Sequence, residues 1–183
     1  KYRLSRQTEH DVDFTLAVDG QQALLARGKM MTGPDDQNMD LNIGIPKLPL
    51  RVAGAFTPPG MIRLGGDMVG AFRIKGNMSQ PLIDGNLSFR EGEVEALPVG
   101  TTFKIDTSTI TIRNNLLKFN HFGLIAPNKQ RLELQGDVNF ASFSSIEMDA
   151  SVTARNFQAM KVQENDETMV YGKLFVDVSA TLK

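Results

Sequence analysis

The chain has 183 residues, of which 41% are hydrophobic and 22% charged, a composition typical of ordered globular proteins and not of disordered, collagen-like or membrane-spanning chains. Its formal charge of −1 provides no field that would attract nucleic acid or an anionic membrane. The absence of cysteine excludes disulfides, thiolate metal sites and cysteine nucleophiles.

Alternation of apolar and polar residues recurs along most of the chain, and this period of two is typical of β-strands with one wet face. The alternating apolar residues are, in chain order, Phe14, Leu16, Val18; Leu41, Ile43, Ile45; Phe72, Ile74; Leu87, Phe89; Phe103, Ile105; Ile110, Ile112; Leu117, Phe119; Leu132, Leu134; Val138, Phe140; and Ile146, Met148, Ala150, Val152. Because successive side chains of a strand point to opposite faces, the pattern predicts a sheet with one continuous apolar face.

Turn-forming dipeptides separate many of these runs. They include Gly65-Gly66, Asp84-Gly85, Glu91-Gly92, Asn114-Asn115, Pro127-Asn128 and Gly136-Asp137. The pair Asn114-Asn115 is the best hairpin candidate, because Asn tolerates positive φ. Only residues 21–27 have helix-forming composition, and a strand followed by a turn is equally open for them. Residues 54–60 and 156–167 are predicted to form irregular crossings.

The prediction is therefore an all-β fold, an extended and curved antiparallel meander folded into a taco-like trough or an open β-sandwich with an apolar interior. Residues 1–183 are expected to form a single β-rich domain or a fragment of a longer repetitive β-sheet protein. Similar Gly-bounded runs begin at Gly70, Gly85 and Gly172, and the chain starts without Met and stops within an alternating run.

No catalytic, metal or cofactor site is predicted, so we expect a protein that is not an enzyme. The two histidines, His10 and His121, have no cysteine to complete a zinc site and favour structural roles. The carboxylates Glu91, Glu93 and Glu95 alternate along one polar face. A hydrolase acting on polysaccharide through Glu93 and Glu95 is the weakest of the functional alternatives.

The apolar face itself is the remaining candidate site, because an open trough would present it to an irregular hydrocarbon ligand. The candidate groove residues, hereafter the twelve groove candidates, are Phe72, Ile74, Leu87, Phe89, Phe103, Ile105, Ile110, Ile112, Leu117, Phe119, Leu132 and Leu134. If two sheets packed closely on each other, the same residues would form an ordinary core.

Several motifs resemble the C-terminal β-sheet region of the TamB-like (translocation and assembly module) proteins, within the wider AsmA-like group. They are Gly85-Asn-Leu-Ser-Phe-Arg-Glu-Gly92, Leu97-Pro-Val-Gly-Thr-Thr-Phe103, Ile110-Thr-Ile112 and Leu117-Lys-Phe119. The later runs Ile146-Glu-Met148, Ala154-Arg-Asn-Phe157 and Tyr171-Gly-Lys-Leu174 resemble versions of that region from Bacteroides-type bacteria.

This resemblance implies a periplasmic segment of a protein anchored in the inner membrane of a Gram-negative bacterium, with an apolar groove that shields lipid acyl chains or nascent β-strands. The implied partners are phospholipid and, through regions outside this chain, a BamA-like outer-membrane barrel; nucleic acid is not expected. The alternative is a surface-exposed β-sandwich adhesin or binding module that recognises protein or glycan through its loops.

Overall fold

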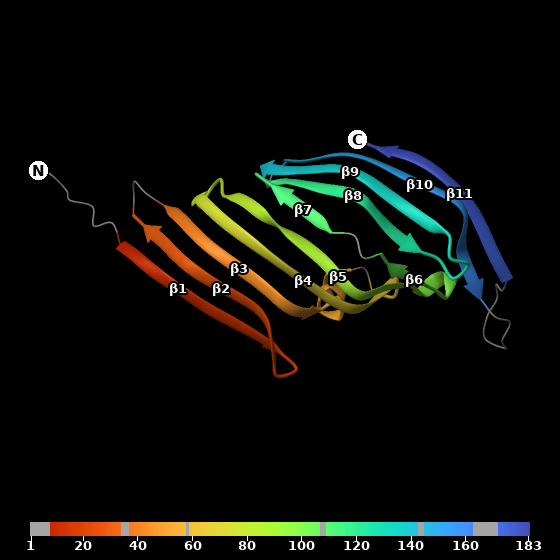
Figure 1. The fold of residues 1–183 in the computed structure, drawn as a ribbon, viewed down its shortest axis with the longest axis horizontal. Helices are drawn as coiled ribbons and strands as arrows, with labels where there is room; N and C mark the ends of the chain where they lie inside the picture. Colours follow the sequence, from red (N-terminus) through yellow and green to blue (C-terminus); the bar gives the residue numbers. More distant parts are fainter. Residues whose placement is uncertain (1–7, 34–36, 58, 107–108, 143–144, 163–171) are drawn as a thin grey trace, which may run out of the picture.

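The computed structural model describes residues 8–33, 37–57, 59–106, 109–142, 145–162 and 172–183. Most of these residues lie in strands, and the strands form one antiparallel sheet of eleven members. In Figure 1 the sheet extends from β1 at one end to β11 at the other, and its C-terminal strands curl over. The predicted all-β, curved antiparallel meander is confirmed.

The elements follow one another along the chain with two short 3₁₀ helices between them. They are β1 (Thr8–Val18), β2 (Gln21–Thr32), β3 (Asn38–Pro49), η1 (Leu50–Phe56), β4 (Ile62–Asn77), β5 (Leu82–Ala96), η2 (Leu97–Val99), β6 (Thr101–Ile105), β7 (Ile110–Arg113), β8 (Leu116–Ile125), β9 (Arg131–Ser142), β10 (Ser145–Val162) and β11 (Gly172–Leu182). Residues 21–27 therefore belong to a strand.

Neighbours in the sheet are mostly neighbours in the chain, in the order β1-β2-β3-β4-β5-β6-β8-β9-β10-β11. The exception is β7, which pairs with β5 and β8, the same two strands that flank β6. The strand β5 pairs with β7 through Gly85–Leu87 and with β6 through Glu93–Ala96. The short strands β6 and β7 thus share one position between two long strands.

The predicted hairpin at Asn114-Asn115 joins β7 to β8, and both residues have positive φ (47° and 65°). Asn115 is buried, and its side chain makes two hydrogen bonds to residues outside the turn. Its Oδ1 accepts the N–H of Ile83 at 2.7 Å, and its Nδ2 donates to the carbonyl of Pro81 at 2.8 Å. The hairpin tip is therefore tied to the start of β5 by one side chain.

Other predicted turns lie inside strands, and close backbone packing explains the glycines there. A Cβ on Gly85 would lie 2.3 Å from the carbonyl oxygen of Ala71 and 2.5 Å from the ring of Phe72, its direct partner on β4. Gly136 on β9 has a φ of +144°, and a Cβ there would lie 2.3 Å from the carbonyl oxygen of Asp149 on β10. These glycines leave room for the close approach of a neighbouring strand, so they continue their own strand instead of ending it.

Three strands contain a β-bulge with a non-glycine residue at positive φ: Glu91 in β5, His121 in β8 and Asn156 in β10. The prediction of an irregular crossing over 156–167 is wrong for residues 156–162, which continue β10. Asn156 absorbs the extra residue of the bulge, and its N–H donates to Asp177 Oδ1 at 2.6 Å. Residues 163–167 lie outside the described residues.

The other predicted crossing, 54–60, falls on the connection between β3 and β4. The irregular connection begins earlier than we predicted, with the 3₁₀ helix η1 (Leu50–Phe56). The first residue of this helix, Leu50, is buried. The helix ends where Thr57 donates to the carbonyl of Gly54 through its N–H (3.2 Å) and its hydroxyl (2.8 Å). Pro59 and Gly60 follow in a turn.

We expect Gly85→Ala to lower the free energy of unfolding by about 2 kcal/mol, the usual scale of overpacking. Gly44 on β3 is the matched control, because a Cβ there would meet nothing within 4 Å. Gly44→Ala should change stability by less than about 1 kcal/mol, in either direction. Urea unfolding followed by circular dichroism measures both, and equal effects would contradict this role for Gly85.

Replacing Asn115 should also destabilise the fold. Asn115→Gly keeps the positive φ but leaves the N–H of Ile83 and the carbonyl of Pro81 without their partner, at a cost of about 2 kcal/mol. Asn115→Ala should cost about 1 kcal/mol more, because alanine is strained at this φ. Asn114→Gly, at the exposed neighbouring turn position, should stay within about 0.5 kcal/mol of the wild type. If it cost as much as Asn115→Gly, the turn and not the side-chain bonds would be responsible.

Candidate functional site: the apolar inner face

The pairing of the strands places the alternating apolar residues of successive strands on one face. Residues directly opposite each other in an antiparallel ladder point to the same side. One such row crosses from Ile110 on β7 to Phe119 on β8. A second row crosses β7, β8, β9 and β10 through Ile112, Leu117, Val138 and Met148. This continuous surface is called the inner face below.

All twelve groove candidates lie on the inner face by register. Phe103, Ile110 and Ile112 are buried, and the other nine are half-buried. The sequence pattern therefore predicted side chains that share one surface. The three buried ones are too deeply packed for a ligand to reach without rearrangement. Their role in binding remains a prediction.

Contacts between strands that are not neighbours show that the inner face is concave. Phe103 on β6 stacks on Phe157 on β10 with ring centroids 5.2 Å apart, although β8 and β9 lie between these strands in the sheet. Phe89 on β5 meets Phe122 on β8 edge to face at 5.8 Å. Side chains this far apart along the sheet can touch only if the sheet bends toward the face that carries them.

The concavity closes completely at one place, near η2. Phe103 and Phe157 form a buried cluster there with Ala126 and Ala154. A polar contact joins the same strands: the Thr101 hydroxyl donates to the carbonyl of Val99 at 2.8 Å and accepts the N–H of Lys161 at 2.8 Å. This end of the trough is a sealed core.

Elsewhere the inner face is open to solvent, most of all at the two ends of the sheet. Phe14 is 52% exposed on β1, and Ile146 is 65% exposed on β10. Leu16, Met148 and Leu182 are also exposed. All the strands of the described residues belong to one sheet, so no second sheet packs over this surface. An apolar surface of this kind can bind another apolar molecule.

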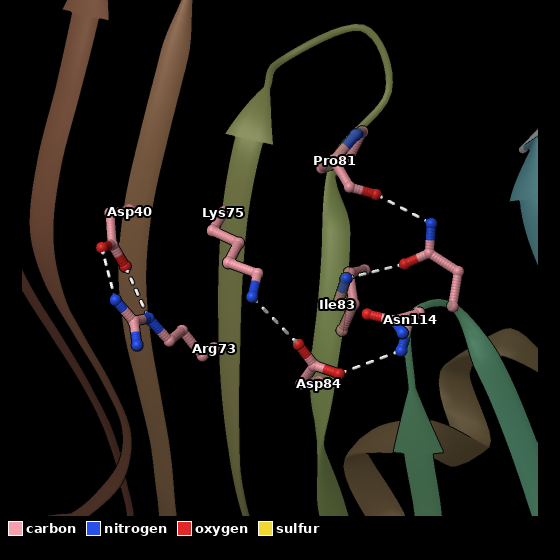
Figure 2. A network of polar contacts seen from close by, with 8 residues as sticks. Asp40, Arg73, Lys75, Pro81, Ile83, Asp84 and Asn114 are labelled. Carbon is pink, nitrogen blue, oxygen red and sulfur yellow. Dashed lines mark hydrogen bonds and ion pairs between the residues drawn. The ribbon is translucent and has the colours of Figure 1, made fainter.

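The outer face carries the charges, which pair across the strands. Arg73 on β4 donates to both carboxylate oxygens of Asp40 on β3, at 2.9 and 2.7 Å, and Lys75 lies 3.8 Å from Asp84 on β5 (Figure 2). Asp84 also accepts the N–H of Asn114 at 2.9 Å. The hydrogen bonds from Arg73 hold the pKa of Asp40 below its ordinary value and raise that of Arg73. These groups are exposed, so each pair adds little stability.

A second polar cluster surrounds the bulge in β8. His121 Nδ1 lies 2.5 Å from Glu133 Oε1, and Arg131 is 2.8 Å from Asp106 and bonds to the carbonyl of His121. Gly123 leaves space for this guanidinium, because a Cβ there would lie 2.2 Å from its Nε. The cluster fastens the bulge to β9.

The geometry gives no support to carboxylate chemistry at Glu93 and Glu95. Glu95 is bonded to Arg63 at 2.6 Å, and Glu93 lies opposite Gly65 and Lys104 on the outer face. Among the described residues, no three His, Asp or Glu side chains are grouped to hold a metal ion. None of the helices in that part of the chain is long and apolar enough to cross a membrane.

The sequence reasoning missed the residues that shape the face. Phe122 and Phe157 meet Phe89 and Phe103, but each follows a bulge, so a strict period of two does not reach it. A sequence signal for these two residues does exist. The alternation of apolar and polar residues shifts by one position after Asn or His, and these residue types tolerate the positive φ of a bulge.

Comparison with known proteins identifies no relative of this chain: no family model, curated protein or solved structure matches it.

Arg73→Gln should raise the pKa of Asp40 toward its ordinary value of 3.8, because the lost hydrogen bonds are the largest cause of the lowered value. A lowered folded-state pKa contributes stability above the unfolded pKa, and this contribution is lost as the pH falls through the folded value. The stability difference between wild type and variant should therefore shrink below about pH 4. Carboxyl ¹³C NMR titration measures the pKa, and Arg27→Gln, which removes the partner of Asp13, should leave Asp40 unchanged.

Proposed function

We propose that this chain is a segment of a TamB/AsmA-like periplasmic protein and that its inner face shields lipid acyl chains or nascent β-strands on their way to the outer membrane. The role is non-enzymatic. The observation that supports it is the inner face itself, which is apolar along the whole sheet, concave, and only half-buried at nine of the twelve groove candidates.

The energetics of such a surface suit a carrier. Each methylene removed from water contributes about 0.8 kcal/mol, while association costs at least about 4 kcal/mol in lost freedom. A partly covered acyl chain would therefore bind and leave again. A face that enclosed the acyl chain fully would retain it. Among the described residues, the inner face is closed only at the end near Phe103 and Phe157.

The motifs that resemble the TamB-like family supply the rest of the proposal. The resemblance implies a parent protein anchored in the inner membrane of a Gram-negative bacterium, with this segment in the periplasm. Contact with a BamA-like outer-membrane barrel would be made by regions outside this chain.

A charge on the inner face should weaken lipid binding, whereas the same charge on the outer face should not. Phe72 and Ala71 are adjacent on β4 and point to opposite faces. Phe72→Glu should weaken binding of dansyl-undecanoic acid about tenfold or more, because the carboxylate must be buried against hydrocarbon. Ala71→Glu should bind as the wild type does. Native mass spectrometry of protein purified without detergent then tests for co-purified phospholipid.

Phe72 also covers Gly85, so circular dichroism must show that the variant is folded. Phe14→Glu, at an exposed position of the same face, is the second variant and should weaken binding without threatening the fold. Equal binding by all four proteins, or none by the wild type, would contradict the carrier role and leave a binding module that acts through its loops.

A further inference from the structure

One row of the inner face brings an imidazole and two thioethers together. His10 on β1 stands directly opposite Met30 on β2, and Met30 stands directly opposite Met39 on β3. These three strands lie side by side in the sheet (Figure 1). Residues directly opposite each other in an antiparallel ladder point to the same side, so the three side chains share the face that carries Phe14.

The spacing of the strands lets the three side chains meet above β2. Neighbouring strands lie about 5 Å apart, so His10 and Met39 are about 10 Å apart, with Met30 midway between them. Methionine has three rotatable bonds, so both thioethers can lean toward a common point. On the far side of Met39 stands Gly76 of β4, where a Cβ would meet nothing within 4 Å. Met30 and Met39 are half-buried and His10 is exposed, so an ion in solution can reach all three.

A threonine on β2 orients the imidazole. His10 Nε2 lies 2.9 Å from the hydroxyl oxygen of Thr32, and that hydroxyl donates its own proton to the carbonyl of Thr8 at 3.5 Å. The oxygen of Thr32 therefore accepts the Nε2–H, and in the neutral ring the lone pair stays on Nδ1. Among the described residues no group bonds to Nδ1. A histidine that donates one ring N–H to a neighbour and keeps the other nitrogen free has the usual arrangement of a metal ligand.

We propose that His10 Nδ1 and the sulfur atoms of Met30 and Met39 bind one soft monovalent cation, Cu(I) or Ag(I). Thioethers select such ions, whereas zinc, magnesium and calcium prefer thiolate, imidazole or oxygen ligands. The carboxylates next to His10 in the chain, Glu9 and Asp11, alternate with it and so belong to the outer face. The site uses none of the twelve groove candidates, so it stands or falls apart from the carrier role.

Titration with Ag⁺, followed by isothermal titration calorimetry in chloride-free buffer, tests the ligands. His10→Gln and Met39→Leu should each weaken Ag⁺ binding at least about tenfold, because each removes a ligand atom. Leucine nearly matches the volume of methionine, so the fold should be kept. Met31→Leu is the matched control: Met31 follows Met30 in β2 but stands opposite Glu9 on the outer face, and its loss should leave the affinity unchanged.

The role of Thr32 as a positioning residue has its own test. Thr32→Val removes the acceptor for Nε2–H and should weaken Ag⁺ binding about tenfold, whereas Thr32→Ser keeps the hydroxyl and should bind as the wild type does. Loss of affinity in both variants, or in neither, would contradict this role.

NMR of methionine labelled with ¹³C in the methyl group shows where the ion binds. The methyl signals of Met30 and Met39 should move first as Ag⁺ is added, and an excess of Zn²⁺ should not reverse the shift. Equal movement of all the methionine signals, or equal weakening by Met31→Leu and Met39→Leu, would mean adventitious binding to scattered thioethers and would overturn the proposal. So would a wild type that binds no Ag⁺, or a site from which Zn²⁺ displaces it.

Discussion

The whole structure depends on keeping the apolar alternation in phase from strand to strand. A slip of one residue in any ladder would move the apolar residues of the following strands to the outer face. The bulges in β5, β8 and β10 threaten this phase, since each adds one residue to its strand. The added residue is accommodated in each bulge by a left-handed backbone at Glu91, His121 or Asn156, so the next apolar side chain returns to the inner face. The inner face therefore continues past these three bulges.

The bulges and the strand glycines together account for the curvature. A bulge bends and twists its strand, and a glycine lets a neighbouring backbone or ring approach closely. Gly85 lies against the ring of Phe72 on β4, and Gly136 lies against the backbone of Asp149 and Ala150 on β10. The sheet therefore bends toward its apolar side, where Phe103 reaches Phe157 across two intervening strands.

The result is a surface with two kinds of region. Near η2 the curl is complete, and a small core of aromatic and alanine side chains excludes water. Toward β1 the same face stays open, and most of its apolar residues are exposed or half-buried, Ile45 being buried. The outer face carries ion pairs between strands, such as that of Arg73 with Asp40.

The sequence by itself determined the fold class, the hairpin at Asn114-Asn115 and the face shared by the twelve groove candidates, because these follow from local turn chemistry and a period of two. It did not determine which glycines end a strand: Gly85 and Gly136 have the same local pattern as a turn. Only the close approach of a neighbouring strand explains their places, with Phe72 against Gly85 and the carbonyl of Asp149 against Gly136. The sealed core and the direction of bending also came from the tertiary structure alone, because Phe103 and Phe157 are distant in the chain and meet only through the curvature of the sheet between β6 and β10.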